Sequence, residues 1–540
     1  MTIENMRAGQ NRLTILLCYL LLVSCGELKT TAAPPNNSIY IKEFKSFQYP
    51  PPSQQWLDNS ADTDLDTLPS LNDEFIKTRF QTFRLNNNLE VFFLPRHDLP
   101  LVNISVLIQA GKNHADDNDE LLSPLVLKLL KQGTVKYSKS EFQQLEALLG
   151  MPIKYRQTSQ YSVISAEILP QDLKLALELL AEQLSQIKPD DKALRTVIEQ
   201  QLLENKLLQS SGFYLAKQLF YKNNYPDGHY YSYQQATSQQ IKAVSEQELI
   251  DFYQRKYVPS NSKIIIAGDF ATKKIQQQIA MQFSNWSEKI AENEYTNTPE
   301  PAQNSQKNRL SSIDLINRKG AAQVNILYGI VTANSVATEI KVATEISVST
   351  EINVTRKIVS SDWVGLKIIA SLLGGGPSSR LFADLREKQG LAYSVSSRQL
   401  EGRFDSPFFI QTSVAYEKVV QTIKGIDNHL DYLCQNEIDE RELTRLKRQL
   451  TGEMVLQFQT NQQLINDKIE QLEMGLPDEY IKDMIQKIDR FTPQELLTIA
   501  NKYLCGVHNI IVVGEKKKLE SDLHRQFKGY RHQTHSLPLQ

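Results

Sequence analysis

Residues 244–269 read VSEQELIDFYQRKYVPSNSKIIIAGD, and residues 491–515 read FTPQELLTIANKYLCGVHNIIVVGE. Both stretches contain Gln-Glu-Leu near the start, Lys-Tyr in the middle, and a glycine followed by an acidic residue at the end. Each one places a serine or threonine before a helical run, and closes with a turn and a β-branched strand. We infer that the chain contains an internal duplication, in which each copy is a whole domain rather than a short repeat.

The length and composition agree with this interpretation. At 540 residues the chain is too long for one compact core. Hydrophobic residues make up 41% and charged residues 23%, which is typical of folded proteins and excludes wholesale disorder. The formal net charge of −2 leaves no basic excess for binding nucleic acid. Four cysteines and eight histidines exclude a disulfide scaffold and a zinc-finger array.

Residues 1–24 have the layout of a secretory signal peptide. The segment 1–12 is polar and carries two arginines, and the apolar run at 13–23 is too short to span a bilayer. The run ends in Leu-Val-Ser followed by Cys25, which resembles a bacterial lipobox and implies cleavage before Cys25 and acylation of its thiol. The alternative is an ordinary signal peptide with an unrelated cysteine. By the same resemblance, the glycine after Cys25 indicates the outer membrane.

Shifts in composition suggest how the rest of the chain is divided. Residues 25–72 are rich in proline, asparagine, serine and aspartate, which is typical of a tether. A second polar stretch at 291–310 indicates a linker between the two copies. The first domain is then 73–290 and the second is 311–525, followed by a polar tail at 526–540. Strand and helix patterns are mixed in both, which predicts an α+β fold.

An unusual insertion lies in the second domain. Residues 336–354 read VATEIKVATEISVSTEINV, a hexapeptide repeated three times. Valine, threonine and isoleucine alternate with small or charged residues, which predicts an extended hairpin, or else a mobile segment. The simplest explanation is a repeat that has expanded in a tolerant surface loop. The alternative is a strand edge that pairs with a partner.

Two pairs of residues raise the question of cross-links or metal binding. Cys434 and Cys505 are the only cysteines after the lipobox. They can pair in an oxidising compartment, but unpaired buried thiols are the more frequent outcome. His532 and His535 lie close together without an intervening glutamate, so we expect them in a solvated tail rather than in a metal site.

Residues 372–397 read LLGGGPSSRLFADLREKQGLAYSVSS. This string resembles the second-domain signature of the insulinase/pitrilysin family, which includes the mitochondrial processing peptidases. The match is dense, because it contains the glycine run, Ser-Ser-Arg-Leu-Phe and Leu-Arg-Glu-Lys-x-Gly-Leu-Ala-Tyr. The resemblance covers most of the two copies. It implies two homologous α+β domains, each with a mostly antiparallel sheet and flanking helices, that together form half of a clamshell.

The same resemblance implies a zinc site in the first domain, but the ligands are missing. In the family, an HxxEH helix supplies two histidines and a general base, and a later glutamate completes the site. At these positions the chain has Pro124 for the first histidine, Leu127 for the glutamate and Lys128 for the second histidine. The later ligand falls near Gln201. None of the first three can bind zinc or act as a base. Ser123 and Pro124 instead suit the cap and first residue of a helix.

The second-domain chemistry is intact. Arg386 and Tyr393 are seven residues apart, which is the spacing of the family's arginine–tyrosine pair. In the family this pair binds the substrate backbone and stabilises the tetrahedral oxyanion, a task that suits preorganised hydrogen-bond donors. The alternative is that Arg386 pairs with a neighbouring carboxylate and Tyr393 is part of the core. By the same resemblance, Gly374, Gly375 and Gly376 form a loop that gathers substrate, although glycines also make plain turns.

The zinc-binding half of the catalytic site is therefore lost, and the half that contains the arginine–tyrosine pair is kept. This pattern predicts a zinc-less subunit of a heterodimeric periplasmic peptidase acting on peptides. A sister chain with HxxEH would supply the zinc, and this chain would hold no cofactor. It would supply Arg386, Tyr393 and substrate-binding walls, and Cys25 would anchor it through lipid. The alternative is a catalytically inactive, lipid-anchored binding or scaffold protein that docks through residues 336–354. A third possibility is an active metallopeptidase that uses other ligands.

Overall fold

The structure is a computed structural model, and the residues that it describes lie within Pro69–Gln540. The predicted signal peptide, Cys25, the tether and the linker lie outside the described residues. For 337–346 and 350–358 only the backbone is described. No helix in the part of the chain that the structure describes is long and apolar enough to cross a membrane. The described residues are 80–112, 119–187, 190–226, 229, 231, 236–287, 311–332, 337–346, 350–402 and 406–537.

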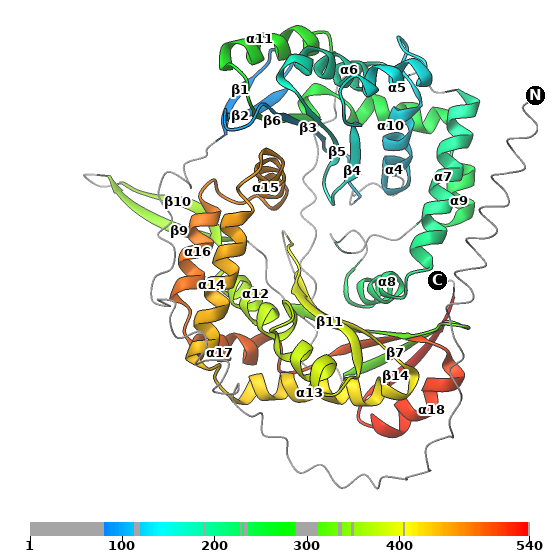
Figure 1. The fold of residues 1–540 in the computed structure, drawn as a ribbon, viewed down its shortest axis with the longest axis vertical. Helices are drawn as coiled ribbons and strands as arrows, with labels where there is room; N and C mark the ends of the chain where they lie inside the picture. Colours follow the sequence, from blue (N-terminus) through cyan, green and yellow to red (C-terminus); the bar gives the residue numbers. More distant parts are fainter. Residues whose placement is uncertain are drawn as a thin grey trace, which may run out of the picture. The chain divides into compact units, whose positions relative to one another are not determined.

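The first domain is built around a six-stranded sheet with the order β1-β2-β6-β3-β5-β4 (Figure 1). β2 and β6 are parallel, and the other neighbouring strands are antiparallel. The strands are β1 (Gln81–Arg84), β2 (Glu90–Pro95), β3 (Val102–Ile108), β4 (Lys154–Gln157), β5 (Ser162–Ile168) and β6 (Ser262–Gly268).

The second domain contains another six-stranded sheet, with the order β11-β12-β8-β13-β7-β14. β7 is parallel to both of its neighbours, and the remaining pairs are antiparallel. The strands are β7 (Ser312–Asn317), β8 (Val324–Thr332), β11 (Ala392–Gln399), β12 (Ser406–Val414), β13 (Asn509–Gly514) and β14 (Arg531–Ser536).

The two sheets share one topology apart from an edge strand. The order β2-β6-β3-β5-β4 corresponds to β7-β13-β8-β12-β11, and in each case the parallel pair comes first and antiparallel pairs follow. The matched sequences also occupy equivalent elements. Each runs through a helix, α10 (Glu246–Lys256) or α17 (Pro493–Tyr503), and then through a central strand, β6 or β13. The structure confirms the duplication and the mostly antiparallel α+β class.

Helices cover the outer face of each sheet and share a hydrophobic core with it. In the first domain these are α4 (Asp119–Leu129), α5 (Lys139–Ala147), α6 (Leu173–Ser185), α7 (Asp191–Gln209), α10 (Glu246–Lys256) and α11 (Thr272–Phe283). In the second domain they are α12 (Ser361–Gly374), α13 (Val419–Gln435), α14 (Glu440–Leu456), α16 (Tyr480–Arg490), α17 (Pro493–Tyr503) and α18 (Lys516–Gln526).

A duplicated ion pair explains why lysine recurs at the end of α10 and α17. Lys256 Nζ lies 2.9 Å from Asp119 Oδ2 at the start of α4, and Lys502 Nζ lies 2.6 Å from Asp362 Oδ2 in the first turn of α12. An acidic residue in the first turn also interacts favourably with the helix dipole. Each lysine therefore fastens the end of one helix to the start of another.

The other face of each sheet is covered by a helix from the opposite half of the sequence (Figure 1). α8 (Gly212–Asn224) packs on the second sheet, and α15 (Asn461–Met474) packs on the first. Because successive strand residues point to opposite faces, Val91 lies in the outer core whereas Phe92 packs with α15. Each half therefore buries apolar surface of the other, and the two halves form one folding unit.

The packing of α8 depends on Gly329 in β8. A Cβ atom at this position would lie 2.2 Å from the ring of the buried Phe220 on α8. We expect Gly329→Ala to destabilise the protein by about 1–3 kcal/mol, because the helix or the ring must shift. Urea unfolding measures the effect. In the control Gly452→Ala, the new Cβ meets nothing within 4 Å inside α14, and stability should rise by about 0.5–1 kcal/mol. Equal stability of Gly329→Ala and wild type would contradict the close approach.

A half-buried acidic cluster joins α15 to the second domain. Lys367 Nζ on α12 lies 3.7 Å from Glu401 Oε1, and the Tyr480 hydroxyl donates a hydrogen bond to Asp467 on α15. Burial raises the pKa of Asp467 to about 6. Burial, followed by the charge of Glu401, raises the pKa of Glu470 to about 9. Glu470 is therefore protonated in the folded protein at neutral pH.

This cluster predicts that stability falls as the pH rises. A carboxyl group with a raised folded pKa binds its proton more tightly in the folded state, so its contribution is full below the ordinary glutamate pKa and is lost as the pH rises toward 9. Glu470→Gln should remove at least about 2 kcal/mol of the loss between pH 5 and pH 8.5. Urea unfolding at the two pH values measures this. The exposed Glu437→Gln is the control, and the same pH dependence in Glu470→Gln and wild type would contradict the prediction.

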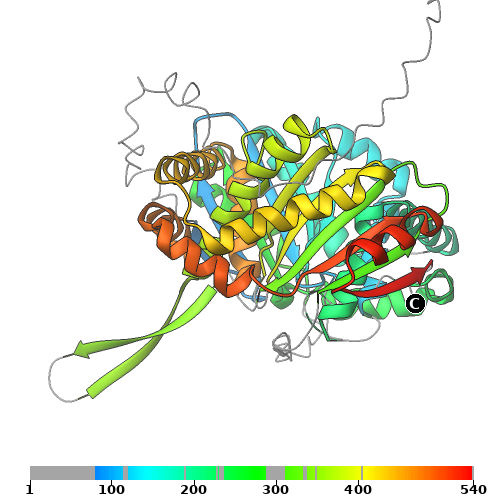
Figure 2. The same ribbon diagram turned by 90° about the horizontal axis from the view of Figure 1, so that it is seen from below.

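The predicted hairpin is confirmed. The insertion forms β9 (Ala337–Ile346) and β10 (Thr350–Val359), which pair only with each other in an antiparallel two-stranded sheet among the described strands. Both views show it extending away from the helices around it (Figures 1 and 2). It lies between β8 and α12, which corresponds to the connection from β3 to α4 in the first domain. Its use as a docking edge stays a prediction.

The predicted polar tail at 526–540 is wrong in its central part. Residues Arg531–Ser536 form β14, which pairs in parallel with β7 and extends the second sheet. His535 Nε2 lies 2.8 Å from the buried carboxylate of Asp314, and His532 donates to a backbone carbonyl at 2.8 Å. These two histidines are therefore held in the domain rather than in a solvated tail. This segment forms a strand because its backbone pairs with β7, not because its sequence alternates between hydrophobic and polar residues.

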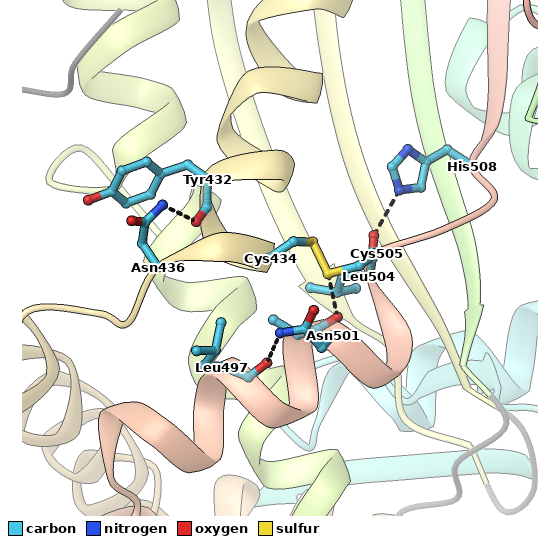
Figure 3. The surroundings of a disulfide bond; sticks show 9 residues. Tyr432, Cys434, Asn436, Leu497, Asn501, Leu504, Cys505 and His508 are labelled. Carbon is cyan, nitrogen blue, oxygen red and sulfur yellow. Dashed lines mark hydrogen bonds between the residues drawn. A yellow bond between two sulfur atoms is a disulfide. The ribbon is translucent and has the colours of Figure 1, made fainter.

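The expectation of unpaired cysteines is also wrong. Cys434 at the end of α13 and Cys505 just after α17 form a disulfide with a Cα–Cα distance of 5.8 Å (Figure 3). This distance is in the usual range for disulfides. The bond joins two helices of the second domain that are 71 residues apart in the sequence. A structural disulfide agrees with an oxidising compartment.

Candidate active site

α4 carries the positions of the expected zinc motif, but it begins earlier than predicted. The helix starts at Asp119, so Pro124 lies inside it and Ser123 is not its cap. The reason is the buried Asp119, whose carboxylate is held by Arg255 at 2.7 Å and by Lys256 at 2.9 Å. Ser123 instead donates a hydrogen bond to a backbone carbonyl of the preceding loop.

Lys128 occupies the centre of the degenerate site. Its Nζ atom lies 2.7 Å from Gln201 Oε1 and 2.7 Å from Glu204 Oε2, both on α7. The Gln201 amide in turn donates to Asn205 Oδ1 at 2.8 Å. Leu127 beside it is buried in the core. The structure thus brings together Lys128 and Gln201, two of the positions that the sequence identified. The ammonium group of Lys128 joins them by donating a hydrogen bond to the Gln201 amide oxygen.

This arrangement does not fit zinc. An ammonium group repels a dication and has no lone pair to donate, and a leucine and a proline offer no ligand atom. Burial, followed by the charge of the neighbouring Lys128, lowers the pKa of Lys131 just after α4. Among the described residues, no group of three or more histidines, cysteines, aspartates and glutamates could hold a metal ion.

Asn205 was missed by sequence reasoning. It lies one helical turn after Gln201, bonds to it, and donates to the carbonyl oxygen of Ala236 at 3.0 Å. The signal was available, because residues four apart share a helix face and both have amide side chains. The network therefore ties α4 and α7 to the loop before α9 (Ser238–Ala243).

Arg386 and Tyr393 lie together in the second domain. The guanidinium carbon of Arg386 is 5.4 Å from the centre of the Tyr393 ring and 4.5 Å from that of Phe382. Tyr393 is 77% exposed and the Arg386 side chain is 38% exposed, so neither belongs to the core. Arg386 Nε also lies 3.3 Å from Glu387 Oε1, an exposed contact of little energetic weight. Two accessible hydrogen-bond donors are thus presented side by side.

A tight reversal of the chain brings this pair together. Arg386 lies on a π-helix, Phe382–Lys388, and Tyr393 lies at the start of β11. Between them, the Gly390 amide donates to the Arg386 carbonyl at 3.1 Å, and the Leu391 amide donates to the Leu385 carbonyl at 2.7 Å. Gly390 has a φ of +58°, which favours glycine. The seven-residue spacing is therefore the length of this reversal.

The glycine run has a clear packing role. Gly374 ends α12, and a Cβ atom there would lie 2.4 Å from the Ser397 backbone nitrogen on β11. Gly375 caps the helix by donating to the Ser371 carbonyl at 3.0 Å, and Gly376 follows in the turn. The glycines therefore let α12 approach β11, the strand that carries Tyr393. A role in gathering substrate stays a prediction.

The two clusters and the paired α+β domains define a class of protein, the insulinase-type peptidases and their inactive relatives. Residues 94–248 match the family described as insulinase (peptidase family M16), and residues 243–450 match the family described as peptidase M16 inactive domain. The chain belongs to the peptidase M16 family.

Its relatives carry both active and inactive descriptions. The chain is 23% identical to an uncharacterized zinc protease of Streptomyces coelicolor, over 73% of this chain and 81% of that one. It is 22% identical to a non-peptidase homolog, YmxG, of Helicobacter pylori, over 75% and 87% of the two chains.

Solved structures share the fold. A protease from Helicobacter pylori superposes with a TM-score of 0.68 at 16% identity and covers 81% of this chain and 99% of that one. The periplasmic protease PqqL from Escherichia coli has a TM-score of 0.61 at 15% identity, over 84% of this chain and 46% of that one.

Proposed function

We propose that this chain is the zinc-less subunit of a heterodimeric M16 peptidase. It contributes Arg386, Tyr393 and the walls of the substrate chamber, and a sister chain with an intact HxxEH helix contributes zinc and the general base. The substrates are peptides, whose backbone carbonyl Arg386 and Tyr393 contact as it becomes an oxyanion. Members of the family often act in pairs, which supports a partner.

One observation carries the proposal. The metal position is filled by an internal ammonium group that is satisfied by Gln201 and Glu204, whereas Arg386 and Tyr393 stay accessible. A chain that had lost all catalytic use would have no need to hold an arginine over an exposed tyrosine. Preorganised donors of this kind are worth a few kcal/mol when they meet developing negative charge.

We also propose that the chain is a lipoprotein of the periplasm, anchored through Cys25 to the outer membrane. The lipobox-like sequence and the disulfide support this location, and a periplasmic protease shares the fold. A long tether at 25–72 would let the folded domains reach a partner in the periplasm.

A second candidate is a catalytically inactive, lipid-anchored binding or scaffold protein. The description of the Helicobacter pylori relative as a non-peptidase homolog favours it. In that case β9 and β10 would be the docking edge, since a two-stranded sheet has unpaired backbone groups on both sides.

Co-purification with a sister chain separates the two candidates. The chain should be inactive alone and should bind an HxxEH protein encoded in the same genome, and the pair should cleave unfolded peptides. Peptide cleavage by the lone chain would refute the proposal. A lone chain that forms a stable homo-oligomer and ignores every HxxEH protein would support the scaffold function.

A further inference from the structure

The segment that presents Arg386 is anchored in the core from its opposite side. Asp384 lies two residues before Arg386 on the π-helix, and its side chain is 6% exposed. His429 on α13 is 7% exposed, and its Nε2 atom lies 2.9 Å from Asp384 Oδ2. A buried carboxylate is costly unless it is hydrogen-bonded, so this contact, together with a hydrogen bond from Gln389, stabilises Asp384 in this position.

The geometry of a helix links the two residues. Residues two apart on a helix point in nearly opposite directions, because each residue turns the chain by about 100° in an α-helix and somewhat less in a π-helix. When Asp384 is held against α13, Arg386 must therefore point to the accessible side. A π-helix is otherwise a rare conformation that often occurs at functional sites, so it needs specific contacts to fix its rotation.

Two further polar contacts hold the ends of the segment. Arg380 forms a bidentate pair with Glu442 on α14, at 3.2 and 2.6 Å. Lys418 Nζ donates to the Gly390 carbonyl at 2.6 Å. On the turn that carries Arg386, the buried Leu385 packs into the core, and the contact between Asp384 and His429 is the polar anchor.

We propose that His429 and Asp384 are positioning residues for Arg386 and, through it, for Tyr393. They fix the rotation of the π-helix so that the guanidinium lies over the tyrosine ring and both donors face substrate. This inference rests on the proposed function for its purpose, but the positioning itself can be tested without any partner.

The first test measures the position of Tyr393 in the full chain alone. A single 3-fluorotyrosine at position 393 reports through its fluorine chemical shift whether the guanidinium lies nearby. Arg386→Ala gives the fluorine chemical shift of the Tyr393 ring when no guanidinium lies nearby. We expect His429→Ala to move the signal most of the way to that value, and His429→Gln, which can still donate to Asp384, to restore it.

Two variants keep this test decisive. His508 is a histidine of similar burial in the same domain, and its Nε2 atom donates to the Leu504 carbonyl at 2.9 Å, away from the π-helix. His508→Ala should leave the fluorine signal unchanged even if it lowers stability. Asp384→Leu has a side chain of similar size that cannot accept a hydrogen bond from His429, so it serves where His429→Ala does not fold. An unchanged Tyr393 signal in folded His429→Ala or Asp384→Leu would overturn the inference.

The second test uses the pair with the HxxEH sister chain and a fluorogenic peptide. His429→Ala should lower kcat about tenfold with little change in KM, because a misplaced donor weakens the transition state more than substrate binding. His429→Gln should recover most of the rate. A lowered kcat that His429→Gln does not restore would overturn the positioning role. If wild-type pairs show no cleavage, the proposed function fails, whereas the fluorine measurement still decides the positioning.

Discussion

Replacing Arg386 by alanine should lower the kcat of the assembled pair about 100-fold, because one donor to the developing oxyanion is lost. Tyr393→Phe keeps the ring and removes only the hydroxyl, so we expect a loss of about tenfold, consistent with one neutral hydrogen bond. Peptide hydrolysis by the pair, measured over a range of substrate concentrations, gives kcat and KM separately. KM should change much less than kcat, since these contacts form mainly in the transition state.

The matched control for this prediction is Arg398→Ala. Arg398 is an exposed arginine on the same strand, β11, five residues beyond Tyr393. Its removal changes the net charge by the same amount but should leave kcat unaffected. A pair in which Arg386→Ala and Arg398→Ala behave alike would show that charge, rather than a positioned donor, explains any loss.

Removing the disulfide between Cys434 and Cys505 should cost about 4 kcal/mol of stability, because the bond closes a long loop in the unfolded chain. The bond has a sequence separation of 71 residues and joins α13 to α17. α13 also carries His429, so the bond stiffens the helix that anchors the π-helix. The Cys434→Ala, Cys505→Ala double variant should therefore unfold at a clearly lower urea concentration than wild type.

A reducing agent provides the control within the same experiment. Reduction should lower the stability of the wild type to nearly that of the double variant and leave the double variant unchanged. A wild type that is insensitive to reductant would mean that the two thiols are not bonded.

Much of the fold could be predicted because the two copies of the duplication still share recognisable residues. Matching Gln-Glu-Leu and Lys-Tyr residues predicted two equivalent domains, and the capping residues Ser245 and Thr492 do form complete capping boxes. The structure adds the reason for the recurring lysine, which is the ion pair to Asp119 or Asp362. Such a pair joins residues more than a hundred positions apart, so local patterns do not reveal it.

The features of the fold that were missed depend on distant contacts. β14 has the polar sequence RHQTHS, and only pairing with β7 makes it a strand. The start of α4 is set by the buried Asp119 rather than by Ser123. The packing of α8 on the second sheet and of α15 on the first has no sequence signal, because the apolar face of a helix does not indicate which sheet it will cover.

The candidate site was predicted only in part, because some of its contacts also join residues that are distant in the sequence. Replacement of the zinc ligands is visible residue by residue, and so is the spacing of Arg386 and Tyr393. The ion pair between Lys128 and Glu204 and the anchor between Asp384 and His429 are not, because each joins two helices that come together only in the folded protein.

The zinc content of the separate chains and of their complex tests the central claim most directly. Metal analysis of this chain, of the HxxEH sister chain and of the purified pair should find zinc in the sister and in the pair, at one ion per pair, and none in this chain. Stoichiometric zinc bound to this chain alone, lost on substitution of Gln201 or Glu204, would contradict the account.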